Sequence, residues 1–156
     1  MTRNAIRDAT RAGVAVTVDT DLRDLPVLLE LCAQTAADQH FAPVASRYIE
    51  AEARIFARHG QAAICCARRD DVALAAVLVL FEGDAAYAHF DASARTAPRS
   101  SAPHLVQWRI MEAAPARGCT QYDLWGTALV GASCRDAAPA PAWVTVVVMV
   151  DVRCAG

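Results

Sequence analysis

Residues 61–93, QAAICCARRDDVALAAVLVLFEGDAAYAHFDAS, decide the fold of this chain. They contain three runs typical of β-strands, at 61–68, 72–82 and 85–93, which are separated only by the charged turn RRDD and the turn EGD. Strands that are joined by turns this short pair antiparallel. The first two runs are almost wholly apolar, as expected for strands at the centre of a sheet that is covered on both faces. We therefore predict an antiparallel meander inside a covered sheet.

Helical segments lie on both sides of this meander in the sequence. A short helix over 2–12, a strand over 14–18 and two helices over 22–40 and 46–60 precede it. A helix from Pro103 to the stop at Pro115 and Gly118, a strand ending at Gly126 and a last strand candidate at 143–152 follow it. Successive antiparallel strands flanked by helices predict the α+β fold class.

The composition is that of one globular domain. The chain has 156 residues, a net charge of −2 and 55% hydrophobic residues, and this charge argues against nucleic-acid binding as the main function. The longest apolar run, AWVTVVVMV, is far shorter than the roughly 20 residues of a membrane-spanning helix, and the N-terminus is charged, so we expect a cytoplasmic protein. The six cysteines form no CxxC pair, which favours buried reduced thiols over disulfides or a metal site. We predict no metal and no cofactor.

Polar side chains alternate along the run 85–93. Tyr87, His89 and Asp91 are separated by single small or apolar residues, so a regular strand places a phenol, an imidazole and a carboxylate on one face. This face either lines a cleft beside Asp123 or meets bulk water. The apolar strands before it favour the cleft, because they indicate a covered sheet.

Arginine is the basic residue of this chain, and lysine is absent from it. Arg3, Arg7 and Arg11 recur every four residues and form a basic stripe on the first helix. The stripe is either a solvated face or a site for phosphate, whose oxygens match guanidinium groups in geometry. Arg95 lies in the loop ASARTAPRSSAPH, which has no glycine and is therefore not a Gly-rich phosphate cradle. A surface loop and a substrate-binding role for Arg95 both stay open.

An acid ends the strand that follows the helix from Pro103. Asp123 must be solvated, hydrogen-bonded or functional there, because burying it unpaired is costly. It either accepts backbone N–H groups of the following turn or takes part in catalysis. The spacing assembles no Ser-His-Asp or Cys-His arrangement, so an enzyme with such a nucleophile is not supported.

Three segments together resemble one family. TRNAIRDATRAGVAV, AYAHFDAS and LVQWRIMEAAPARGCTQYDLWG are similar, in this order, to the second half of the FemAB-type peptidoglycan bridge aminoacyltransferases. The hallmarks of that half are a tryptophan-bearing helix, a glycine and a strand that ends in a YDxWG-like motif. The resemblance spans residues 2–126.

The resemblance implies a fold and an activity. Residues 1–126 would form one domain like the GCN5-type N-acetyltransferases (GNAT), with a mixed, mainly antiparallel sheet, and 127–156 a divergent tail with one added strand. The family transfers an aminoacyl group from charged tRNA to an amine of a peptidoglycan precursor. The expected partners are therefore this precursor, either lipid II or UDP-MurNAc-peptide, and the acceptor end of aminoacyl-tRNA. A membrane-bound precursor would bring the protein into peripheral contact with the membrane.

The resemblance also implies roles for single residues. Asp123 and Tyr87 become the catalytic candidates, since either side chain could assist loss of the proton from the amine. Arg3 and Arg7 become candidates for the phosphates of the precursor, and Trp125 would lie with Asp123 beside the acceptor cleft. The full set of substrate-binding candidates is Arg3, Arg7, His89, Asp91, Arg95, Trp108 and Trp125.

Two departures from the family pattern lead us to expect little or no transfer activity. The first domain of the family has no counterpart here, and the basic segment with an aromatic–lysine pair expected after Gly126 is absent from residues 127–156. A shifted reading frame after Gly126 is one hypothesis for this tail. Two further hypotheses stay open. One is a small acyl-CoA N-acyltransferase of the same superfamily, although no Q/R-x-x-G-x-G/A loop precedes residue 103. The other is a non-catalytic remnant that associates with a partner.

Overall fold

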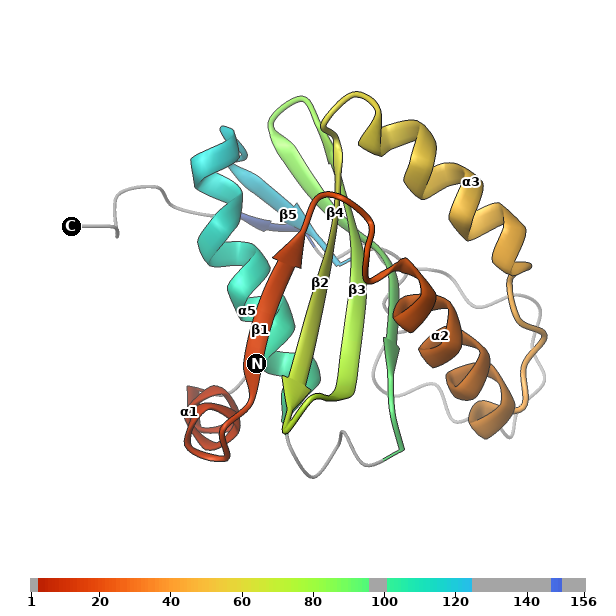
Figure 1. Cartoon of the computed structure of the whole chain (residues 1–156). Coiled ribbons are helices and arrows are strands. Elements are labelled where there is room, and N and C mark those ends of the chain that lie inside the picture. Colours follow the sequence, from red (N-terminus) through yellow and green to blue (C-terminus); the bar gives the residue numbers. More distant parts are fainter. Residues whose placement is uncertain (1–2, 96–100, 125–146, 150–156) are drawn as a thin grey trace, which may run out of the picture.

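A six-stranded sheet forms the middle of the computed structural model, which describes residues 3–95, 101–124 and 147–149 (Figure 1). Its strands lie side by side in chain order: β1 Ala15–Asp19, β2 Ala62–Arg69, β3 Val72–Glu82, β4 Ala85–Ser93, β5 Gln121–Asp123 and β6 Val147–Met149. Neighbouring strands pair antiparallel except β4 and β5, which are parallel. The predicted meander is confirmed, and β6 falls within the last strand candidate.

The turn between β2 and β3 shows how the sequence sets the meander. Asp70 and Asp71 both have positive φ, at 49° and 64°. Two consecutive residues in the left-handed region are the mark of a type I′ turn, whose twist matches that of the antiparallel strands that it joins. The two acidic residues therefore help to fix the register in which the apolar strands pair.

Helices cover both faces of the sheet (Figure 1). On one face lie α1 Arg3–Arg11 and α5 Ala102–Ala113, which the 3₁₀-helix η1 Ala114–Arg117 continues. On the other face lie α2 Leu25–Gln39 and α3 Ser46–Ala57. This arrangement confirms the α+β class predicted from the order of the elements.

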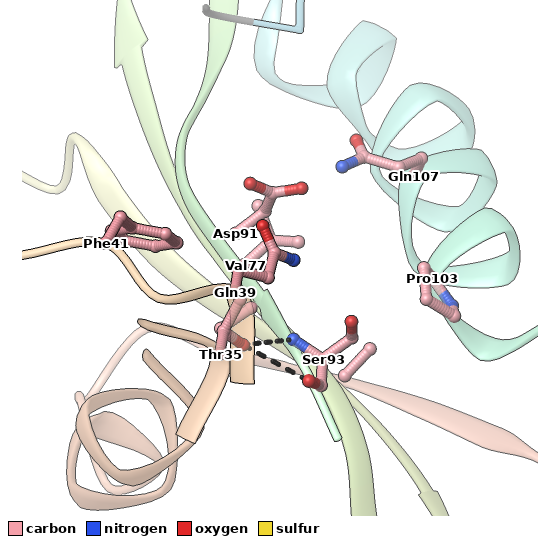
Figure 2. A pocket seen from close by; sticks show the side chains of 10 residues that line it. Thr35, Gln39, Phe41, Val77, Asp91, Ser93, Pro103 and Gln107 are labelled. Carbon is pink, nitrogen blue, oxygen red and sulfur yellow. Dashed lines mark hydrogen bonds between the residues drawn. The ribbon is translucent and has the colours of Figure 1, made fainter. Parts of the chain in front are cut away.

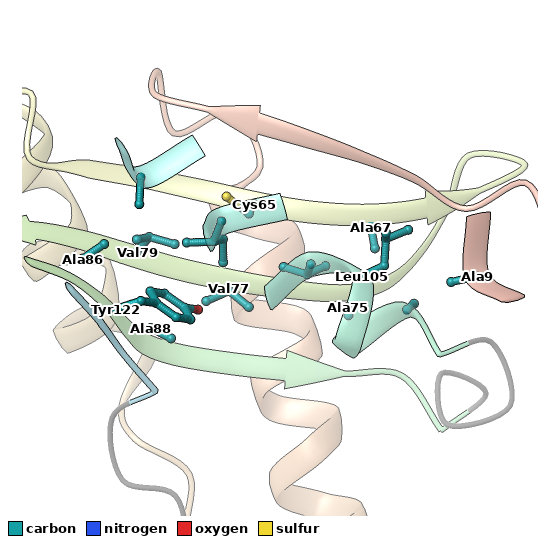
Figure 3. Packing of buried hydrophobic residues seen from close by; sticks show 14 of the residues in the cluster. Ala9, Cys65, Ala67, Ala75, Val77, Val79, Ala86, Ala88, Leu105 and Tyr122 are labelled. Atoms are coloured by element: carbon teal, nitrogen blue, oxygen red, sulfur yellow. The ribbon is translucent and has the colours of Figure 1, made fainter. Parts of the chain in front are cut away.

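Each face of the sheet has its own hydrophobic core. Val77 and Val79 of β3 pack beneath α5, together with Tyr122 of β5, which is fully buried (Figure 3). Leu78 and Leu80, which alternate with them along β3, pack beneath α2 and α3. Thus α2 and α5 stand on opposite faces of β3 and β4.

A β-bulge in β4 determines where its polar side chains lie. The pairing of β3 with β4 shifts register after Leu78, which makes His89 the extra residue of the bulge. Tyr87 therefore lies toward α2 and α3, whereas Asp91, opposite Val77, lies toward α5. The prediction that Tyr87, His89 and Asp91 share one face is wrong, because it assumed a regular strand of period two.

β4 and β5 pair only at their beginnings. Ala85–Tyr87 are bonded to Gln121–Asp123, and β4 then continues alone to Ser93. Within the described ranges no strand is paired with the outer edge of β4 after Tyr87. In the part of the chain that the structure describes, the sheet is therefore open along this edge, between the ends of α2 and α5.

Candidate functional site

Tyr87 and Asp123 lie side by side where β4 and β5 part. They are register partners of the parallel pair, so their side chains point to the same face, that of α2 and α3. Tyr87 packs against the core of that face, and Asp123 is 7% exposed. The structure thus brings together the two residues that the sequence analysis named as catalytic candidates.

A cavity of about 340 Å³ lies further along the open edge of β4 (Figure 2). Thr35 and Gln39 of α2 line one side of it, and Pro103 and Gln107 of α5 line the other. The side chain of Asp91 points into the space between these two sides (Figure 2). The cavity is therefore a cleft between the two helical layers, with β4 as its floor.

Thr35 ties the α2 side of the cavity to β4. Its hydroxyl group donates a hydrogen bond to the carbonyl oxygen of Ser93 at 3.2 Å and accepts one from the Ser93 N–H at 3.3 Å (Figure 2). These two backbone groups point away from β3, and in an antiparallel ladder every second residue does so. The backbone N–H and C=O of Asp91, two residues earlier, therefore also point outward. Because the Asp91 N–H already donates to the Asp91 carboxylate, this edge offers the Asp91 carbonyl oxygen as an acceptor to a ligand in the cavity.

Asp91 gives the cavity a negative charge. Its side chain is exposed to the solvent of the cavity, yet neighbouring protein atoms desolvate the carboxyl group and raise its pKa above the ordinary 3.8. A hydrogen bond from its own backbone N–H partly offsets this rise in pKa. Burial first, and then the charge of Asp91, raise the pKa of the Cys32 thiol on α2 to about 11. Among the described residues no cation pairs with the Asp91 carboxylate.

Tyr122 and Gln107 hold the α5 side of the cavity. The hydroxyl group of Tyr122 donates a hydrogen bond to Oε1 of Gln107, one turn of α5 beyond Pro103. Burial is the main cause that raises the pKa of Tyr122, and the charges of Asp91 and Asp123 add to it. The Tyr122 phenol therefore stays neutral and serves as a hydrogen-bond donor.

His89 forms a second polar pair, with a residue that the sequence analysis missed. Its Nε2 lies 2.9 Å from a carboxylate oxygen of Glu52 on α3, and the two side chains are 14% and 19% exposed. The sequence feature that could have identified Glu52 is its position on the helix. It lies between the buried Ile49 and Ala53 on the core-facing side of an amphipathic helix, where an acid needs a partner.

Several predicted site residues lie apart from the cavity. Arg3 and Arg7 are exposed on α1. Arg95 follows β4 and is 84% exposed, with a guanidinium nitrogen 4.0 Å from a carboxylate of α2. Trp108 is 41% exposed on α5 and is not part of the cavity lining, and Trp125 lies outside the described residues.

Cofactor and metal ligands are sparse in the described ranges. Within them, His, Cys, Asp and Glu side chains form no group of three or more that could hold a metal ion. The described residues that line the cavity include neither lysine nor arginine. None of the helices in the same ranges combines the length and the apolar character needed to cross a bilayer.

Comparison with known proteins assigns the family. The sequence model of the acetyltransferase (GNAT) domain family matches residues 1–137. The chain belongs to this GNAT family. No curated protein matches the sequence of this GNAT domain significantly.

Solved structures share the fold of this GNAT domain. FemX superposes with a TM-score of 0.77 at 16% identity, over 95% of this chain and 54% of FemX. The ribosomal-protein-S18-alanine N-acetyltransferase of Escherichia coli gives a TM-score of 0.60 at 13% identity, over 76% of this chain and 70% of the enzyme. The PaiA N-acetyltransferase of Thermoplasma acidophilum, in complex with coenzyme A, gives 0.50 at 12% identity, over 71% and 79%.

These likenesses confirm the fold implied by the sequence resemblance. The mixed, mainly antiparallel sheet flanked by helices is the GNAT fold. FemX supports the resemblance to the FemAB-type proteins at the level of this fold, and the chain spans about half of its length.

Proposed function

We propose that this GNAT domain moves an aminoacyl group from charged tRNA to an amine of a peptidoglycan precursor. One observation carries the proposal. β4 and β5 part directly after Tyr87 and Asp123, and the cavity beyond them holds the acid Asp91 and no basic side chain among its described lining. Such a cavity suits a ligand that carries an amine. The fold shared with FemX over 95% of the chain supports the same choice.

Tyr87 and Asp123 are proposed to act on the attacking amine. An aminoacyl ester is already activated, so transfer requires mainly that the amine be positioned and that the oxyanion of the tetrahedral intermediate be stabilised. A base that removes the proton of the amine adds a factor of about 10²–10⁴ in rate. Asp123 is our candidate for this base, with the Tyr87 hydroxyl group beside it as the alternative.

The remaining binding roles follow from exposure and charge. Arg3 and Arg7 are exposed guanidinium groups on one helix and are proposed to bind phosphates of the precursor, lipid II or UDP-MurNAc-peptide. Further proposed contacts to the precursor and to the tRNA acceptor end are His89, Arg95, Trp108 and Trp125. The proposal places the reaction in the cytoplasm, where charged tRNA is found, with peripheral contact to a membrane-bound precursor.

Acyl transfer from an acyl-coenzyme A is the second candidate. It is favoured by the fold shared with the S18-alanine N-acetyltransferase and with the PaiA enzyme in complex with coenzyme A. The chemistry of the cavity disfavours it. The negative charge of Asp91 would repel a pyrophosphate between α5 and β4, and the described lining supplies no basic residue in compensation.

The domain limits are also a proposal. We place the GNAT domain at 1–126 and a divergent tail at 127–156, and we expect transfer by this chain alone to be slow or absent. The oxyanion would lack the cation that the resemblance leads us to expect after Gly126, and an electrostatic contribution of this kind is worth about 10²–10³ in rate. Binding is therefore the first measurement to make.

Isothermal titration of the purified chain tests the function. The ligands are 3′-alanylamino-3′-deoxyadenosine, which is a stable mimic of the aminoacylated tRNA end, then UDP-MurNAc-pentapeptide, and acetyl-coenzyme A. We expect the first two to bind and the third not to bind. Micromolar binding of acetyl-coenzyme A without binding of the other two would move the protein to the coenzyme A-dependent enzymes.

A single-turnover assay with excess chain, alanyl-tRNA and UDP-MurNAc-pentapeptide tests the catalytic candidates. Where transfer is measurable, Asp123→Asn should slow it by about 10²–10⁴-fold. Tyr87→Phe should slow it less, and the matched control Tyr48→Phe, at a tyrosine that is 57% exposed on α3, should leave it unchanged. Equal rates for Asp123→Asn and the unaltered chain would remove Asp123 from the chemistry.

A further inference from the structure

The described lining of the cavity on the edge of β4 carries negative charge and no positive charge. Among the described residues that line it, Asp91 is the ionisable one, and the others are amides, hydroxyls and apolar groups. The first basic residue after β4 in the sequence, Arg95, is 84% exposed and lies beside Asp38 of α2. Among the described residues the partly desolvated carboxylate of Asp91 has no counter-ion, which is unfavourable, and a bound cation would relieve this cost.

The shape of the site limits the kind of cation. Its volume of about 340 Å³ is at the lower end of the range of small-molecule pockets. The backbone carbonyl of Asp91 points outward beside its carboxylate, and Thr35 and Gln39 add polar atoms on one side. Phe41, Val77 and Pro103 add apolar surface. Several acceptors that line one cavity, next to an apolar wall, match a primary ammonium group on a compact carbon skeleton.

Other ligands match this chemistry less well. A metal ion would need several anionic or imidazole ligands, and in the described part of the chain no group of three such residues exists. A phosphate or carboxylate ligand would meet the charge of Asp91 without a compensating cation in the described lining. An organic ammonium ion is left as the ligand class that the lining favours.

We propose that this cavity binds the α-ammonium group of the aminoacyl donor, with the carboxylate of Asp91 as its counter-ion. The inference rests on the proposed function, because it names the group of the donor that this part of the site recognises. Asp91 would then determine specificity. A donor with a free amine would bind, whereas an N-acylated donor would lose its charge and keep a single N–H, so its interaction with Asp91 would be weaker.

NMR titration of the ¹⁵N-labelled full chain tests this inference. The probes are L-alaninamide and its N-acetyl derivative, and 3′-alanylamino-3′-deoxyadenosine and its N-acetyl derivative. Free-amine probes should shift the amide signals of Thr35, Asp91 and Ser93, and N-acetylation should weaken their binding by about 10- to 100-fold, the range expected for a hydrogen bond to a charged group. Equal binding of free and acetylated probes, or no binding of any probe, would overturn the inference.

Variants distinguish direct contact between the ammonium group and Asp91 from a general effect of negative charge on the protein. Asp91→Asn keeps the shape of the side chain and should abolish the preference for the free amine, whereas Asp91→Glu should retain part of it. Asp38→Asn is the matched control, because it removes an acid of α2 that is outside the lining. Measurements at physiological ionic strength screen such distant charges. A preference that persists in Asp91→Asn, or that is lost in Asp38→Asn, would contradict the assignment.

The binding results for these probes can refute the role of Asp91 and the proposed function separately. If the aminoacyl nucleoside binds with and without N-acetylation alike, the aminoacyl-transfer proposal stands and the role of Asp91 fails. If alaninamide binds in an Asp91-dependent way while neither the nucleoside nor the precursor binds, the ammonium site stands and the proposed donor and acceptor fail.

Discussion

The hydrogen bond between Tyr122 and Gln107 leads to an asymmetric prediction about stability. Tyr122 is fully buried beneath α5, and its hydroxyl group donates to Oε1 of Gln107, which borders the cavity. Within the described ranges no buried side-chain nitrogen or oxygen lacks a partner, so this pair is part of a satisfied interior. Removing the donor and removing the acceptor should therefore have different costs.

The loss of stability in each variant depends on whether water can replace the lost hydrogen-bond partner. In Tyr122→Phe the amide of Gln107 can turn to the solvent of the cavity, and the loss is that of one net hydrogen bond, about 0.5–1.5 kcal/mol. In Gln107→Met the hydroxyl group of Tyr122 stays buried without an acceptor, which costs about 1–3 kcal/mol. The double variant removes both partners, so it should be close in stability to Tyr122→Phe alone.

Urea unfolding of the four proteins, followed by circular dichroism, measures these differences. For a chain of this length each kcal/mol also corresponds to a shift of roughly 2–4 °C in Tm. We expect Gln107→Met to be the least stable, with a coupling energy of about 1–3 kcal/mol between the two positions, as large as the loss in Gln107→Met alone. Additive losses within about 0.5 kcal/mol, or a larger loss for Tyr122→Phe, would refute the argument.

Three further predictions concern charge. The folded state raises the pKa of Asp91 above 3.8, so protonated Asp91 favours the folded state. This contribution to stability is complete below about pH 3.8 and is lost as the pH rises through the raised pKa. By calorimetry, Asp91→Asn should therefore have a higher Tm than the unaltered chain at pH 7 and the same Tm near pH 3. Replacing both Arg3 and Arg7 with alanine should weaken the binding of UDP-MurNAc-pentapeptide by about 10-fold or more and change Tm by less than about 2 °C, because both side chains are exposed; unchanged binding with a large loss of Tm would reverse this assignment. Acetyl-coenzyme A should show no saturable heat of binding up to millimolar concentration, and Asp91→Lys is the variant in which weak binding should emerge.

The order and type of the elements could be predicted because local signals agreed with one another. The runs at 61–68, 72–82 and 85–93 are apolar and are separated by turns, and they became β2, β3 and β4 with boundaries within one residue. Gly118, with φ of 80°, ends the helical segment where the sequence placed the stop. Turn chemistry and strand propensity act over a few residues, so one sequence is sufficient to show them.

The pairing of functional groups could be predicted only in part. Tyr87 and Asp123 meet because β5 lies parallel beside the start of β4, which no local pattern contains. The resemblance to a family implied only a mixed, mainly antiparallel sheet. Glu52 was missed because its partner, His89, is far away in the sequence. Contacts of this kind depend on the packing of α3 against the sheet, which a single sequence does not display.

The bulge at His89 explains why one strand serves two different polar sites. In a regular strand Asp91 would follow Tyr87 and His89 onto the face of α2 and α3, opposite the buried Ala76, where its carboxylate would be costly to bury. The extra residue reverses the faces to which the later side chains of β4 point. Apolar Phe90 therefore packs on that core instead, and Asp91 reaches the cavity. The imidazole is left on the α3 side, where Glu52 pairs with it. One added residue therefore resolves the conflict between burial and charge, and it places the acid where a ligand with an amine can reach it.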